Sequence, residues 1–207
     1  MTLDALLTFI AASTLLAFAP GPDNIFVLMQ SALHGRRAGI FITLGLCTGL
    51  LVHTSLVALG VAALIIMSAT AFTILKLVGA AYLVYLALLS WRASAEVGDA
   101  EKAPALGVGQ YYLRGILMNL SNPKVAIFFL AFLPQFARPE SGSVTAQLIV
   151  LGGFFILVTL GVFMLIAVLA SRLAASFQRS TKLQIGLNRL AALVFFGLAA
   201  RLALSSR

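Results

Sequence analysis

Two long stretches of the sequence contain no charged side chain, and they constrain the fold more than any other feature. No Asp, Glu, Lys or Arg occurs between Arg37 and Lys76, or between Glu140 and Arg172. A helix needs about 20 apolar residues to cross a bilayer, so the first stretch is long enough for more than one crossing. Only 10% of the residues are charged, whereas soluble domains carry about 25%. The sequence therefore predicts an all-α membrane protein that crosses the bilayer several times.

The apolar segments divide residues 1–207 into six expected spans that form one transmembrane domain. These spans are roughly Leu3–Leu33, Ala38–Met67, Ala71–Trp91, Tyr112–Leu133, Val144–Ala170 and Ile185–Leu204. A polar loop at about 93–111 separates three spans, in about 1–92, from three more in about 112–207. Lys and Arg are concentrated in the loops of one side, which predicts that this side is cytoplasmic. With an even number of spans, both termini are then expected outside the cytoplasm.

Two polar breaks interrupt the first and the fourth expected spans. The residues of the first break are Pro20, Gly21, Pro22, Asp23 and Asn24, and those of the second are Asn119, Asn122, Pro123 and Lys124. Proline lacks a backbone N–H and disrupts a helix, and the freed backbone groups need protein or a water-filled cavity as partners. Each half contains three spans, so two related halves would have opposite orientations. Corresponding breaks predict a 3+3 inverted repeat, whose binding site lies where the breaks meet.

Charged residues at these breaks are the first candidates for function. An ionisable side chain is costly at membrane depth, so we expect Asp23 to bind a substrate ammonium or to exchange a coupling proton. Its alternative role is to cap a half-helix that starts near Asn24. The N-terminus of such a half-helix, with the Gly21 backbone, suits a substrate carboxylate. Lys124 is expected to bind a substrate carboxylate or to neutralise the charge of Asp23. The alternative is that its long side chain extends to the lipid headgroups at the membrane surface.

Three further side chains are candidates within the apolar spans. His53 is expected to form an interhelical hydrogen bond, with a proton-relay role as its alternative. Tyr82 and Tyr85 either line the transport cavity or pack between helices.

Several motifs, taken in order along the chain, resemble the LysE/RhtB family of bacterial amino-acid exporters. The motifs are Pro20-Gly21-Pro22-Asp23-Asn24, Gly35-Arg36-Arg37-Ala38-Gly39, Gly45, Gly49, the run Lys76–Leu83, Asn122-Pro123-Lys124, and Phe132-Leu133-Pro134-Gln135-Phe136. The resemblance covers essentially the whole chain. It implies a six-helix transporter of the bacterial inner membrane, with periplasmic termini, that exports amino acids or similar metabolites by using the proton gradient.

Other function classes find less support in the sequence. A metal-cation or other small-solute efflux carrier is the alternative, but the two histidines and one cysteine lie far apart, so no metal site is expected. No nucleophile–base pair or phosphate-binding loop predicts an enzyme, and no cofactor is expected. The expected partners are a small-molecule substrate and the lipid bilayer, without nucleic acid, and self-association is left open.

Overall fold

The computed structural model describes residues 2–61, 68–93 and 105–204, and the regular structure in these ranges is helical. In chain order the helices are α1 (Leu3–Phe18), α2 (Pro22–His34), α3 (Arg36–Leu56), α5 (Ala69–Arg92), α6 (Val108–Ser121), α7 (Pro123–Ile127), α8 (Val144–Arg179) and α9 (Thr181–Leu204). A π-helical turn, Val57–Val61, continues α3, and Phe128–Phe132 continues α7 in the same way. Short 3₁₀ turns follow at Leu133–Phe136 and Pro139–Ser141.

Four of these helices are long and apolar enough to cross a membrane. They contain the segments Arg36–Gly60, Thr70–Arg92, Val144–Ala170 and Gln184–Leu204. The number rises to 6 if α1 with α2, and α6 with Pro123–Phe136, each count as one span. The all-α membrane class predicted from the sequence is therefore confirmed.

Each bent pair has a local cause in its sequence. Helix α1 ends at Ala19, and Gly21 is extended before Pro22 occupies the first position of α2. Asn122 ends α6 in an extended conformation, and Pro123 occupies the first position of α7. This follows from the clash that biases a residue before proline away from the helix. The axes bend by 57° at the first break and by 53° at the second.

Two helices extend beyond the approximate spans expected from the sequence. Helix α8 continues to Arg179, although a connecting segment was expected from Ser171. The added residues include Leu, Ala, Gln and Arg, which are strong helix formers and do not need a membrane around them. Helix α6 starts at Val108, inside the expected loop, because Gln110 Oε1 accepts the Gly107 N–H at 3.0 Å. Most of that loop, residues 94–104, lies outside the described part of the chain.

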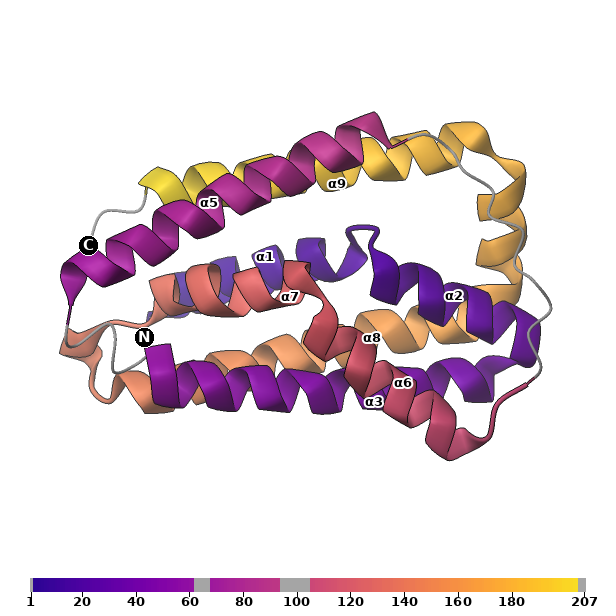
Figure 1. The fold of residues 1–207 in the computed structure, drawn as a ribbon, viewed down its shortest axis with the longest axis horizontal. Coiled ribbons are helices and arrows are strands. Elements are labelled where there is room, and N and C mark those ends of the chain that lie inside the picture. The colour runs from indigo at the N-terminus through magenta and orange to yellow at the C-terminus, as the bar shows by residue number, and fades with distance from the viewer. Residues whose placement is uncertain (1, 62–67, 94–104, 205–207) are drawn as a thin grey trace.

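Helices α1, α2 and α7 lie between two groups of long helices, whereas α6 runs across α3 (Figure 1). Helices α5 and α9 run side by side along one side of the molecule, and α3 and α8 pack together on the opposite side. The start of α1 and the end of α9 lie at the same end of the molecule (Figure 1). Both breaks are thus placed near the middle of the long axis, between the two groups.

A cluster of buried phenylalanines fixes α7 and the turns that follow it. The Phe128 ring lies 4.8 Å from that of Phe155 in α8 and 5.0 Å from that of Phe132. Phe9 of α1 contacts Phe136 with 5.1 Å between ring centroids. Aromatic pairs at such distances add to the free energy gained by burial. The cluster therefore holds the segment after the second break against both α1 and α8.

Helices α3 and α6 cross at a pair of glycines, and we expect this crossing to tolerate no side chain. A Cβ on Gly115 would meet the Ile42 carbonyl oxygen and would lie 3.0 Å from Gly45 Cα. Gly115→Ala should therefore lower the free energy of unfolding by about 1–3 kcal/mol, as overpacking does. Gly109→Ala in the same helix is the matched control, since a Cβ there meets nothing within 4 Å. Equal thermal stability of the two variants in detergent would contradict the close crossing.

Candidate functional site

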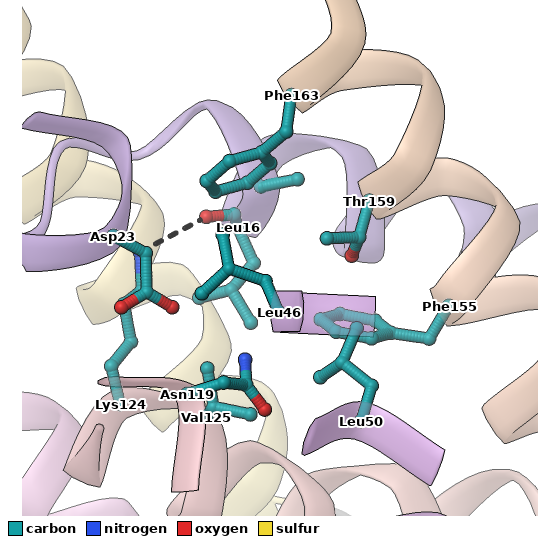
Figure 2. Close-up of a pocket in the computed structure, with 11 residues that line it drawn as sticks. Leu16, Asp23, Leu46, Leu50, Asn119, Lys124, Val125, Phe155, Thr159 and Phe163 are labelled. Carbon is teal, nitrogen blue, oxygen red and sulfur yellow. Dashed lines mark hydrogen bonds between the residues drawn. The ribbon is translucent and has the colours of Figure 1, made fainter. Parts of the chain in front are cut away.

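The two breaks are in direct contact through Lys124. Its Nζ donates hydrogen bonds to the carbonyl oxygens of Ala19, at 3.0 Å, and of Leu16, at 3.5 Å. Figure 2 shows the second of these bonds, between α7 and the end of α1. The last carbonyls of a helix lack intrahelical partners and carry the negative end of its dipole. The Lys124 ammonium thus binds the C-terminal end of α1, and the residue is only 7% exposed.

Two residues of the first break fit closely around this contact. Asn24 Nδ2 donates to the Ala17 carbonyl oxygen at 2.7 Å, which ties the first turn of α2 back to α1. A Cβ on Gly21 would lie 2.9 Å from Lys124 Nζ, closer than real Cβ contacts. Because Gly21 has no side chain, the Lys124 ammonium can lie against the backbone of the first break.

Asp23 lies in the first turn of α2 and is 4% exposed. Its Oδ1 has no hydrogen-bond partner among the residues that the structure describes. The groups that act on its carboxylate are the amides of Asn119 and Asn122 and the charges of Lys124 and His53. The capping alternative is wrong, because α2 begins before Asp23 and its cap residue is Gly21. In the second break Asn122 caps instead, since its Oδ1 accepts the Lys124 N–H at 3.0 Å.

The Asp23 carboxylate faces a small chamber that we call the inner chamber (Figure 2). Its volume is about 20 Å³. Its lining residues are Leu16, Ala17, Asp23, Leu46, Leu50, Asn119, Lys124, Val125, Phe155, Thr159 and Phe163, and all of them are buried. Within the described part of the chain, Asn119 Oδ1 and Thr159 Oγ1, like Asp23 Oδ1, have no hydrogen-bond partner. These atoms belong to residues that line the same small, partly open space.

A second, larger cavity lies on the other side of the breaks, toward α5 and α9. We call it the outer cavity, and its volume is about 430 Å³. Its lining residues are Pro20, Gly21, Pro22, Ile25, Tyr82, Tyr85, Leu86, Leu89, Ser90, Ala93, Asn122, Pro123, Lys124, Asn188 and Phe195. Lys124 lines both cavities, whereas Asp23 lines the inner chamber and not the outer cavity.

The comparison with protein families decides what kind of protein has this arrangement. The model of the LysE type translocator family matches residues 14–206. The chain belongs to this family. The homoserine/homoserine lactone efflux protein of Salmonella typhimurium is 38% identical to this translocator over 84% of each chain. An uncharacterized membrane protein of Vibrio cholerae is 30% identical over 95% of each chain. The leucine efflux protein of an Enterobacter species is 28% identical over 95% of the translocator and 93% of the relative. No solved structure matches.

The remaining candidates lie near the same contact in this translocator. His53 Nε2 lies 3.3 Å from the Asn119 carbonyl oxygen. This is an interhelical hydrogen bond between α3 and α6, of the kind expected from the sequence. Tyr82 and Tyr85 line the outer cavity, with 5.7 Å between their ring centroids. The sequence analysis missed Thr159 and Asn188, because neither is charged and neither stands at a break. Their only signal is a polar side chain within an apolar helix.

Proposed function

We propose that this translocator is a secondary active exporter of amino acids or related small metabolites across the bacterial inner membrane, driven by the proton gradient. The observation that carries the proposal is the buried carboxylate of Asp23, which lies where two helix breaks meet. Its Oδ1 has no hydrogen-bond partner in residues 2–61, 68–93 and 105–204. The printed names of two relatives, which describe efflux of homoserine and its lactone and of leucine, support amino acids as the substrate class.

The proposed chemistry follows from how a carboxylate behaves away from water. Its charge is costly there unless a proton or a cation is bound. Asp23 therefore exchanges a coupling proton or holds the ammonium of the substrate. Lys124 supplies the opposite charge, and it already acts on Asp23 electrostatically. Broken helices place exposed backbone groups and side chains of both signs at one point, as transporter sites require.

The proposed architecture counts each bent pair as one broken span. The result is six spans in a 3+3 inverted repeat, with the breaks in the first span of each half. The similar bends of 57° and 53°, and the hydrogen bond from Lys124 to Ala19, support this arrangement. The midplane position of the breaks follows from the repeat.

We expect both termini to be periplasmic, because Arg and Lys gather at the opposite end of the molecule. Single cysteines introduced into Cys47→Ala protein test this orientation, since the chain has no other cysteine. In intact cells a membrane-impermeant maleimide should label Ser141→Cys, which lies at the same end of the molecule as the two termini. It should not label Ala105→Cys, which lies at the opposite end. The reverse pattern would show that the orientation is wrong.

Counterflow tests the proposed function. Purified protein in liposomes loaded with an unlabelled amino acid should accumulate the same labelled amino acid transiently, while empty liposomes should not. The panel contains the common amino acids, L-homoserine and, for the alternative function, divalent metal ions. Counterflow of a metal ion, with none for any amino acid, would replace the proposal by cation efflux.

A further inference from the structure

The two cavities differ in the size of ligand that they admit. A space of about 10–15 Å³ is the smallest that holds one water, so the inner chamber, at about 20 Å³, holds about one. Sites for small organic ligands are typically about 300–1,000 Å³, and the outer cavity, at about 430 Å³, falls in this range. An amino acid fits the outer cavity and does not fit the inner chamber.

We propose that the substrate binds in the outer cavity, with its carboxylate toward Lys124, and that the inner chamber admits only water and the proton exchanged by Asp23. This assignment rests on the proposed function and decides between the two roles left open for Asp23. The ammonium of the substrate then does not contact the Asp23 carboxylate, because that carboxylate lines the inner chamber.

The walls of the outer cavity complement a small zwitterion. Of the described residues that line it, Lys124 alone is charged, so this side chain is the counter-charge for a carboxylate. The paired rings of Tyr82 and Tyr85 offer aromatic faces, which attract a substrate ammonium. Asn188 adds an amide, and Leu86 and Phe195 add apolar wall for the rest of the molecule.

Lys124 links the two cavities physically. Its Nζ is bound to the Ala19 carbonyl oxygen, next to Gly21, which lines the outer cavity. The same charge acts on Asp23, together with that of His53. A substrate carboxylate that draws the ammonium toward the outer cavity weakens its attraction to Asp23. Substrate binding and proton exchange are thereby coupled through one side chain.

Equilibrium binding of radiolabelled L-homoserine and L-leucine to the purified protein tests the assignment. Ser90→Phe places a large ring in the outer cavity and should weaken binding at least tenfold. Ser55→Phe, on an exposed face of α3, is the matched control and should bind like the wild type. Asn188→Leu keeps the volume but removes the amide, and should weaken binding about threefold to tenfold. If gel filtration shows that Ser90→Phe does not fold, Asn188→Leu alone provides the test of the outer cavity.

Asp23→Asn separates the two cavities. Its binding of both probes should stay within about threefold of the wild type, while its proton-driven transport is lost. Full binding by Ser90→Phe and Asn188→Leu, with binding abolished in Asp23→Asn, would overturn the assignment and place the substrate at Asp23. If the wild type binds neither probe nor any common amino acid, the proposed function fails, and this site fails with it.

Discussion

Asp23→Asn is expected to abolish uphill, proton-driven export and to leave the fold intact. Asparagine keeps the shape of the side chain but neither carries a charge nor exchanges a proton at neutral pH. The carboxylate Oδ1 has no hydrogen-bond partner within the described ranges, so the substitution breaks no hydrogen bond at that atom. Export of labelled L-homoserine from inverted or loaded vesicles should fall to the level of empty vesicles. The melting temperature in detergent should fall less than in a Lys124 variant, because the Lys124 ammonium keeps its hydrogen bonds to Ala19 and Leu16.

Asp4→Asn is the matched control for this prediction. Asp4 is exposed in the first turn of α1, far from both breaks in the chain, so its variant should transport at the wild-type rate. Exchange of labelled for unlabelled substrate, measured without a proton gradient, should persist in Asp23→Asn. Wild-type export with normal gradient dependence in Asp23→Asn would remove Asp23 from the mechanism.

Lys124→Met is expected to destabilise the protein more than any other single substitution at the breaks. The variant leaves the Ala19 carbonyl oxygen without its hydrogen bond and the buried Asp23 carboxylate without its counter-charge. A buried polar group that loses its partner costs about 1–3 kcal/mol, and a charged group costs more. The loss should appear as a lower midpoint of thermal or denaturant unfolding in detergent.

Two comparisons make the Lys124 prediction specific. Lys182→Met replaces an exposed lysine and should change the unfolding midpoint little. In the double variant, removal of the Asp23 charge by Asp23→Asn should restore part of the stability lost in Lys124→Met, because the two charges interact. Strict additivity of the two substitutions would show that Lys124 serves only the end of α1.

The bends could be predicted from the sequence because their cause is local. Pro22 and Pro123 act on the residues next to them, and this is enough to end one helix and begin another. The long apolar runs likewise fix the membrane class without any tertiary information. Helix ends that lie beyond the apolar segment, such as Arg179 at the end of α8, carry no such signal and were missed.

The partners of the charged residues could not be predicted, because they come from distant parts of the chain. Lys124 binds the carbonyl oxygen of Ala19, 105 residues away, and backbone carbonyls look the same at every position. Thr159 reaches the inner chamber only because α8 packs against the first break. The division into a small and a large cavity likewise depends on packing, which apolar composition leaves open.

The most direct test of the account is the proton movement that accompanies substrate flux. Purified protein is placed in liposomes that contain a pH-sensitive dye, and an L-homoserine gradient is imposed across the membrane. We expect protons to move opposite to the substrate in the wild type, and Asp23→Asn to exchange substrate without this proton movement. Substrate flux without proton movement in the wild type, or equal proton movement in Asp23→Asn, would contradict it.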